Sequence, residues 1–405
     1  MPKGVLANKQ ICIVHPQTIH DDVRLHKAVR ALSKAEAEIT IACIEDMNEN
    51  SGELEKFAKI WRIPRAPHYF PSSKHPVWLV RVLYNILIAN LIQKIQGFLY
   101  KNDPLQGMAQ RIAQKNFDAV HFINYNSTRE ALRLQKISGA PYIYETYECW
   151  QKILQNKKWL KREAECVQNA SAAIVVSEPI REVYSKYAPQ TPVMIIYNVA
   201  PSAPLPPTEV HQPIRFYLQS FLRRHYGIEI ALKTFSKVKG DFTVTIQGPA
   251  HEPGYLNELM SLKNELELNK RVIFAEPCSY ENAVEVANQH DVGFLFFPEY
   301  IDGAYNYNGE WSLPNKLFVY SSAGLAMLFS KFQIATKELI KKSNAALFVN
   351  GDDENSIASI LQGLIDNPKQ IDLMKRASYK WAQQFTQSTE ETKLTNLYSS
   401  LFSKE

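Results

Sequence analysis

The sequence predicts an α/β protein of two domains, each built on a parallel β-sheet. Three observations favour this class. The chain has 405 residues, a length that suits two domains of ordinary size. Short apolar runs alternate with amphipathic helical stretches in both halves of the chain. Between the halves, residues 201–213 contain five prolines, which neither a helix nor a central strand accommodates.

The first strand, loop and helix are the clearest elements. Residues 10–15 form a short apolar run, and residues 16–20 form a polar loop that contains a proline. Asp21 and Asp22 are suited to cap the helix that follows, and residues 38–44 are the next predicted strand. A strand–helix–strand unit implies parallel strands, whose carboxyl ends bind ligands in α/β sheets. We therefore expect the loop after the first strand to face a cleft.

The same rhythm continues through the chain and defines its domains. We predict an N-terminal domain at 1–200, a linker at 201–213, a C-terminal domain at 214–385 and a C-terminal helix at 386–405 that could pack back on the N-terminal domain. A long surface loop within one domain is the alternative for the linker, although structureless loops of this length are uncommon. The further predicted strands are 119–123, 142–144, 172–176, 193–197, 214–218, 242–247, 272–274, 292–296, 325–329 and 346–349.

Composition excludes several classes of protein. Apolar residues make up 45% and charged residues 21% of the chain, which is typical of a globular protein and not of a disordered one. The net charge of +5 comes without a long basic run, so we expect no nucleic-acid partner. The five cysteines have neither CxxC nor zinc-like spacing, and no Asp-x-Asp pair suggests a divalent cation, so we expect buried thiols in a reducing cytoplasm and no metal.

Residues 75–100 form an unusual apolar stretch with aromatic residues and flanking cations. Arg81, Asn85, Asn90 and Lys94 interrupt it, and their transfer into lipid would be too unfavourable for a membrane span. Two interpretations remain open. The stretch is either an interfacial helix on the inner face of the cytoplasmic membrane or a buried helix of the N-terminal domain.

The most specific pattern lies at residues 312–327, which read SLPNKLFVYSSAGLAM. It resembles the "LPNKLFEY…AGLP" segment of glycosyltransferase family four, whose members are retaining enzymes with the GT-B fold that use nucleotide-sugar donors. Shorter stretches occur in the order of that family. They are residues 22–24, 39–41, 142–148, 175–177, 196–198, 246–249, 272–274 and 291–293.

The resemblance implies a two-domain GT-B fold, with two Rossmann-like domains facing across a cleft and the donor on the C-terminal side. A loop that opens a helix has free backbone amides that can bind phosphate, and a lysine there adds positive charge. The residues that the resemblance implies at the donor site are Arg223, Arg224, Gly248, Glu276, Pro277, Leu313, Pro314, Asn315 and Lys316.

Several family positions carry different residues here. The acidic residue that usually holds the ribose hydroxyls is replaced by Val319, which cannot accept a hydrogen bond. The usual Arg and Lys that bind the diphosphate fall on Phe221 and Tyr226, although Arg223 and Arg224 between them could substitute. A family histidine falls on Tyr147 and a second one on Ile123, whereas His121 remains.

Candidate catalytic residues follow the predicted strands of the N-terminal half. His121, Glu145 and Glu148 are expected at strand ends facing the cleft, and Glu148 is the candidate base for an acceptor hydroxyl. Pairing with nearby cations is the structural alternative. The candidate sugar or acceptor residues are Asp22, Arg24, Asn308 and Glu310, with helix capping as the alternative for Asp22.

Together these features predict a glycosyltransferase without a cofactor, which moves a sugar from a nucleoside-diphosphate sugar to a glycan or lipid-linked acceptor. The replaced donor-site residues keep a second function open. In that alternative the chain is a catalytically degenerate GT-B protein that acts as a binding or partner subunit. A sugar epimerase of the same fold is a third alternative.

Overall fold

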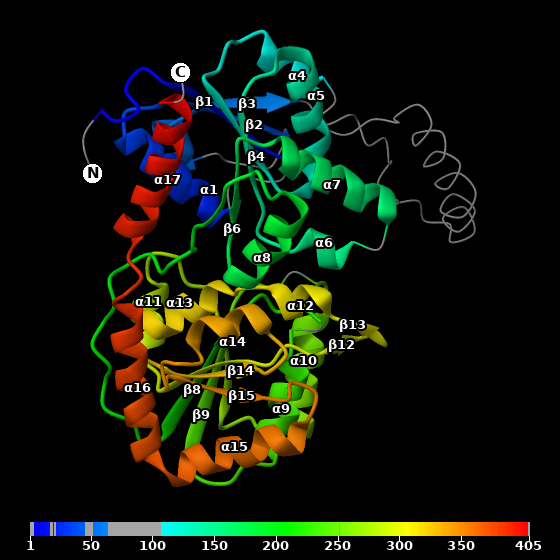
Figure 1. The fold of residues 1–405 in the computed structure, drawn as a ribbon. Helices are drawn as coiled ribbons and strands as arrows, with labels where there is room; N and C mark the ends of the chain where they lie inside the picture. Colours follow the sequence, from blue (N-terminus) through cyan, green and yellow to red (C-terminus); the bar gives the residue numbers. More distant parts are fainter. Residues whose placement is uncertain are drawn as a thin grey trace, which may run out of the picture.

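The computed structural model describes residues 4–16, 19, 22–44, 52–63, 107–154, 156–224, 226–250 and 252–403. Within these residues the chain forms two parallel sheets, one in each half, and a small hairpin. Figure 1 shows the two sheets one above the other, each covered by helices on both faces. The apolar stretch at 75–100 lies outside the described residues. Among the helices that the structure describes, none is long and apolar enough to span a membrane.

The N-terminal sheet has the strand order β3-β2-β1-β4-β5-β6-β7, and every neighbouring pair is parallel. Its central strands are apolar on both faces because helices cover both faces. The strands are β1 (Gln10–His15), β2 (Glu38–Ile44), β3 (Lys59–Ile63), β4 (Ala119–Ile123), β5 (Tyr142–Glu145), β6 (Ala172–Val175) and β7 (Val193–Ile195).

Alternate side chains of β1 point to opposite faces of the sheet, and each face is covered by its own layer of helices. Ile11 and Ile13 pack toward α1 and the C-terminal helix α17, whereas Cys12 and Val14 belong to the core under α4, α5, α7 and α8. The helices of this half are α1 (Val23–Lys34), α4 (Met108–Ala113), α5 (Thr128–Ser138), α6 (Trp150–Ile153), α7 (Lys157–Asn169) and α8 (Glu178–Tyr187), with short 3-10 turns at Gly52–Lys56 and Tyr125–Ser127.

The C-terminal sheet has the order β10-β9-β8-β11-β14-β15 and is also parallel. The Pro-rich stretch joins it to β7, with no helix or strand described between the two. The strands are β8 (Ile214–Gln219), β9 (Phe242–Gln247), β10 (Val272–Ala275), β11 (Val292–Leu295), β14 (Ala326–Ser330) and β15 (Ala346–Val349), and the separate hairpin is β12 (Tyr300–Ile301) with β13 (Ala304–Tyr305).

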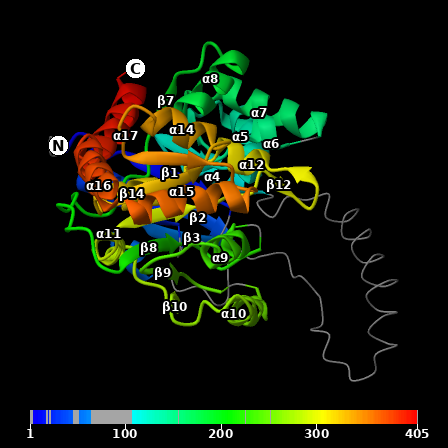
Figure 2. The same ribbon diagram turned by 90° about the horizontal axis from the view of Figure 1, so that it is seen from below.

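Helices cover both faces of this sheet, and the last one leaves it. In Figure 2, viewed from below, α9 and α15 are seen on the C-terminal half, while α17 continues from α16 toward the N-terminal half. There α17 packs against α1. The helices are α9 (Ile228–Ser236), α10 (Tyr255–Glu265), α11 (Ala283–Asn288), α12 (Tyr307–Trp311), α13 (Asn315–Ser322), α14 (Ile334–Ile340), α15 (Glu354–Asp366), α16 (Pro368–Ala382) and α17 (Gln387–Phe402).

A buried ion pair anchors α16 and the linker to the C-terminal sheet. The Lys375 ammonium lies 2.8 Å from a carboxylate oxygen of Asp291, and neither side chain is exposed. Asp291 also accepts hydrogen bonds from the backbone N–H groups of His211 and Arg215. Burial alone would raise the pKa of Asp291, but the hydrogen bond and the charge of Lys375 hold it below its usual value.

The predicted fold class, with two α/β domains on parallel sheets, is confirmed. Each strand predicted above is present, with ends that differ by at most two residues. The sequence missed β3 and the β12–β13 hairpin. Lys59 and Arg62 interrupt the apolar pattern of β3, as is common in edge strands.

Candidate functional site

A cavity of about 580 Å³, which we call the interdomain cavity, lies between the two domains. Its walls come from loops that follow β5 on one side and β8, β9 and β11 on the other, so it lies at the carboxyl ends of both sheets. The residues that line it are Tyr147, Glu148, Phe221, Arg223, Arg224, Tyr226, Glu252, Phe297, Ile301, Asn306, Asn308, Gly309, Ser312, Leu313, Pro314, Asn315 and Lys316.

The amino end of α13 forms one wall of this cavity. Pro314 is the N-cap residue and no side chain caps the first turn, so the helix presents backbone amides and the positive end of its dipole. Lys316 lies in that turn, and burial lowers its pKa to about 8. An anion bound here would restore the charged form of the lysine. This end of the cavity is therefore suited to a phosphate group.

The two predicted arginine clamps differ in their surroundings. The Arg224 guanidinium contacts Glu258 at 2.6 Å and Glu252 at 3.5 Å, and lies 4.9 Å from the centroid of the Tyr255 ring. Arg223 is exposed, and no described side chain forms an ion pair with it. Both line the cavity, but only Arg223 has its donors available to a ligand. A donor-site role for both arginines stays a prediction, and the carboxylates beside Arg224 compete with a ligand for that side chain only.

Gly248 does not line the interdomain cavity, and its geometry explains why a glycine is required there. It has φ of 153°, and a Cβ atom on it would lie 1.8 Å from the backbone oxygen of Ser220. This close approach packs the loop after β9 against the loop after β8, which carries Arg223. The role of Gly248 in the structure is to position that loop rather than to contact the cavity.

Glu148 is the predicted catalytic residue that the structure places in the cavity. It is partly buried, and this burial raises its pKa above the usual value, although the charge of Arg24 acts in the opposite direction. A carboxylate with a raised pKa is a better proton acceptor. The Arg24 guanidinium lies 4.3 Å from the centroid of the neighbouring Tyr147 ring, in a cation–π contact.

His121 and Glu145 lie elsewhere, and the expectation that they face the same cleft as Glu148 is corrected. His121 is fully buried in the central strand β4; its Nε2 lies 2.9 Å from Glu145 and its Nδ1 lies 2.9 Å from the Tyr398 hydroxyl of α17. These contacts link the returning helix to the N-terminal sheet. The side chain of a residue within a strand points to one of two faces, and here the face is the one covered by α17.

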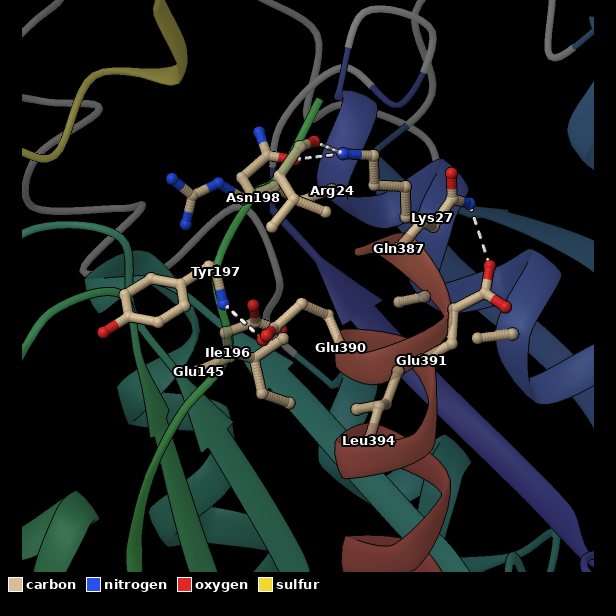
Figure 3. Close-up of a pocket in the computed structure, with 13 residues that line it drawn as sticks. Arg24, Lys27, Glu145, Ile196, Tyr197, Asn198, Gln387, Glu390, Glu391 and Leu394 are labelled. Carbon is tan, nitrogen blue, oxygen red and sulfur yellow. Dashed lines mark hydrogen bonds between the residues drawn. The ribbon is translucent and has the colours of Figure 1, made fainter. Parts of the chain in front are cut away.

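Glu145 lines a second, smaller cavity of about 50 Å³, which we call the hinge cavity. Figure 3 shows that α1, the chain after β7 and α17 surround it. Its polar lining residues are Arg24, Lys27, Glu145, Asn198, Gln387, Glu390 and Glu391. Glu390 accepts a hydrogen bond from the Tyr197 backbone N–H at 2.9 Å, which fixes the chain just before the linker against α17.

The remaining predicted residues divide between the cavity and structural positions. Asn308 lines the interdomain cavity. Asp22 caps α1, because it accepts hydrogen bonds from the Arg24 and Leu25 backbone N–H groups, and it also lies 2.8 Å from His15 Nε2. Asp21 lies outside the described residues.

Three further predicted residues do not line the interdomain cavity. Glu310 accepts a hydrogen bond from the Trp311 indole N–H at 2.8 Å. Glu276 and Pro277 are exposed on the loop after β10, where the Glu276 carbonyl accepts a hydrogen bond from Gln247. Their predicted roles as acceptor or donor contacts are therefore not supported by their positions.

Three further polar or charged residues lie around the cavity, of which sequence reasoning missed Glu252 and Ser312, while Asn306 belongs to the same loop as the predicted Asn308 and Glu310. Asn306 caps α12, donates to the Pro298 carbonyl at 3.0 Å and lines the cavity. Glu252 lies beside Arg224, and Ser312 lies between α12 and α13. A lone Ser or Glu next to a turn looks like an ordinary loop residue, so no sequence pattern pointed to Ser312 or Glu252. Within the described part of the chain, no group of three or more His, Cys, Asp or Glu side chains is placed to bind a metal ion.

Comparisons with known proteins find similarity in structure but not in sequence. No protein-family model matches the chain, and no curated protein matches it. Among solved structures, sucrose-phosphate synthase from Thermosynechococcus elongatus is similar with a TM-score of 0.73 at 14% identity, covering 98% of this chain and 100% of that one. HepE from Anabaena, solved in complex with UDP, has a TM-score of 0.71 at 13% identity, covering 97% and 100%.

A glycosyltransferase from Rickettsia africae is similar over 98% of this chain and 100% of its own, with a TM-score of 0.69 at 14% identity. Because the likeness covers 97–98% of this chain and 100% of the other three, it extends over both domains. The order of strands in the two sheets and the cavity between them agree with this likeness. The chain therefore has the two-domain GT-B fold of these glycosyltransferases.

Proposed function

We propose that the protein is a glycosyltransferase that uses a nucleoside-diphosphate sugar. One observation carries this proposal: the amino end of α13, with Lys316 and Arg223 nearby, meets Glu148 of the other domain across one cavity. The first group of residues suits a diphosphate, and Glu148 suits an acceptor hydroxyl. HepE, which shares the fold, has been solved with UDP and with UDP-glucose.

In the proposed reaction the bond between the anomeric carbon and the β-phosphate oxygen breaks, and a bond from that carbon to the acceptor oxygen forms. The acceptor proton passes to Glu148. The leaving diphosphate keeps the electron pair, and its charge is stabilised by the α13 amides, Lys316 and Arg223. Retention of the anomeric configuration is part of the proposal and follows from the resemblance at residues 312–327. A glycan or lipid-linked acceptor is also part of it, and the apolar sequence at residues 75–100 suggests the lipid-linked form.

A second candidate function is that of a binding or partner subunit without transfer activity. Two observations favour it. Arg224 is held by Glu252 and Glu258, and Val319, at the position of the family's ribose-binding carboxylate, is buried with 3% of its surface exposed. A donor would then have fewer polar contacts than in the family that the sequence resembles.

Titration calorimetry with UDP, GDP and ADP and with their glucose conjugates tests the proposal, followed by an assay for nucleotide release with simple sugars as acceptors. We expect at least one nucleotide to bind and its sugar conjugate to be turned over. Binding without turnover would favour the second candidate. Absence of binding by all six compounds would overturn the donor site itself.

The two arginines provide a matched pair of variants. Arg223→Ala is expected to weaken binding of the nucleotide about tenfold, because a charge-assisted contact to phosphate is lost. Arg224→Ala is expected to change the affinity less than threefold, since Glu252 and Glu258 already occupy its donors. Calorimetry on both variants measures the difference. The reverse order of effects would mean that Arg224 leaves its carboxylates to bind the ligand.

The lowered pKa of Lys316 predicts a pH dependence of binding. The free protein loses the Lys316 proton as pH rises through about 8, while the bound diphosphate keeps it on the lysine. Nucleotide affinity should therefore be constant below about pH 7.5 and fall by up to about tenfold per pH unit above pH 8. Lys316→Met should bind more weakly at neutral pH and show a flat profile from pH 7 to 9. A sloping profile in Lys316→Met would assign the titration to another group.

A further inference from the structure

Lys27 of α1 makes contacts that reach beyond its own domain. Its ammonium donates to the Asn198 side-chain oxygen at 2.8 Å, to the Val199 carbonyl and to the Tyr280 hydroxyl at 2.8 Å. Figure 3 shows Lys27 pointing from α1 toward Asn198, next to the hinge cavity. Tyr280 belongs to the loop after β10 of the C-terminal domain. Lys27 thus joins α1, the residues just before the linker and the C-terminal domain.

Two consecutive hydrogen bonds connect Lys27 through Asn198 to Asn315 at the interdomain cavity. An ammonium group has only donors, so Asn198 must present its oxygen to Lys27 and its NH₂ group to the opposite side. That NH₂ group donates to the Asn315 side-chain oxygen at 2.8 Å. The Asn315 oxygen is therefore occupied, and its own NH₂ group is the remaining hydrogen-bonding group of this side chain. Asn315 is the first residue of α13 and lines the interdomain cavity.

The orientation of the Asn198 amide does not depend on whether Lys27 is protonated. Burial lowers the pKa of Lys27 to about 7, and the charge of Arg24 acts in the same direction, while Glu391 and Glu390 of α17 oppose it. A neutral amine keeps two N–H donors for Asn198 and Val199, and its lone pair can accept from the Tyr280 hydroxyl. Asn198 consequently presents its oxygen to Lys27 in both states.

We propose that Lys27 is a positioning residue for the donor site, because through Asn198 it orients the Asn315 amide so that its NH₂ group faces a bound diphosphate. The inference rests on the proposed function and goes beyond it by assigning a role to two residues outside the cavity. If Asn315 were turned over, its oxygen would face the phosphate and repel it. The contacts of Lys27 and Asn198 therefore determine which end of the Asn315 amide faces the donor site, and they also connect the two domains.

The variant Asn198→Asp tests the orientation of the Asn315 amide while it keeps the contact between residue 198 and Lys27. The aspartate still accepts from Lys27, so the contact at the hinge is kept or strengthened, but it cannot donate to Asn315. We expect the thermal midpoint to be maintained and UDP affinity, measured by calorimetry, to fall about tenfold. Lys27→Met, which frees Asn198 to turn, should lower the affinity similarly, whereas Lys27→Arg should largely restore it. Lys161→Met, on the exposed face of α7 and outside both cavities, is the control and should bind as the wild type does.

A double-mutant cycle with Asn315→Ala excludes a simple effect of the new negative charge. In the Asn315→Ala background, Asn198→Asp should have little further effect, because no amide is left to orient. An equal loss of affinity in both backgrounds, or wild-type affinity in Asn198→Asp, would overturn the inference.

If the wild-type protein binds no nucleotide, the proposed function fails while the positioning can still be examined. Hydrogen exchange in residues 313–318 should then be faster in Asn198→Asp than in the wild type, because the first turn of α13 loses the contact from Asn198. Equal exchange rates in the two proteins would overturn the coupling between the hinge and α13.

Discussion

Glu148→Gln is expected to lower the turnover number by about 10²- to 10⁴-fold, the range for loss of a general base. Glutamine keeps the size of the side chain but cannot take the acceptor proton. Because Glu148 belongs to the N-terminal wall of the cavity, away from α13, nucleotide affinity should stay within about twofold. Steady-state rates of nucleotide release and calorimetry on the same preparation measure the two quantities.

A matched control shows whether the effect belongs to this carboxylate. Glu178→Gln changes a half-exposed carboxylate on α8 that pairs with Arg181 and lies outside the interdomain cavity, so its turnover should equal that of the wild type. Near-normal turnover in Glu148→Gln would contradict the assignment and leave the diphosphate itself as the proton acceptor. Loss of nucleotide binding in Glu148→Gln would indicate a role in the donor site instead.

Lys375→Met is expected to lower the free energy of unfolding by about 3–5 kcal/mol, the range for breaking a buried ion pair from one side. The methionine fills the space of the lysine, but Asp291 remains buried, and its remaining partners are the backbone N–H groups of His211 and Arg215 and the His211 imidazole, whose Nδ1 lies 3.0 Å away. Urea denaturation followed by circular dichroism measures the change. Lys380→Met, on the exposed part of the same helix, is the control and should change stability by less than about 0.5 kcal/mol.

Stability close to that of the wild type in Lys375→Met would show that Asp291 becomes protonated or hydrated at little cost. The pH dependence of the free energy of unfolding, compared between the wild type and Lys375→Met, tests the contribution of the ion pair independently. Lys375 holds the pKa of Asp291 below its usual value, so this pair stabilises the wild type above about pH 4 and is lost as pH falls through the lowered pKa. The variant should lack that part of the acid dependence.

The sequence predicts the fold well because parallel strands buried on both faces are short, continuous apolar runs. Strands such as β4 and β11 could be located from these runs alone. Hairpin β12–β13 escaped prediction because its strands have only two residues each, pair only with each other and show no periodicity. Edge strand β3 escaped because charged residues interrupt it.

The candidate site was predictable where the signal is local and not where it depends on distant partners. Pro314, Asn315 and Lys316 follow from a loop that opens a helix, and they line the cavity. Arg223 and Arg224 are neighbours in sequence, and the carboxylates that separate their roles lie on another segment, at Glu252 and Glu258. Lone residues such as Glu252 carry no pattern that reveals such a pairing.

The contacts of Lys27 and His121 show the same limit over longer distances. Lys27 meets Asn198 and Tyr280, which lie 171 and 253 residues further along the chain, and His121 meets Tyr398 at a separation of 277 residues. The return of α17 brings His121 and Tyr398 together, the contact between the two domains brings Lys27 to Tyr280, and the folding of the N-terminal domain brings Lys27 to Asn198. Single-sequence patterns report local structure, so contacts of this kind become visible only in the folded chain.

A crystal structure of the protein with UDP tests the central claim most directly. We expect the diphosphate to lie against the backbone amides of Asn315 and Lys316 at the amino end of α13, with the Arg223 guanidinium in contact. A nucleotide bound at the hinge cavity, or a diphosphate turned away from α13 in the interdomain cavity, would contradict the proposed donor site.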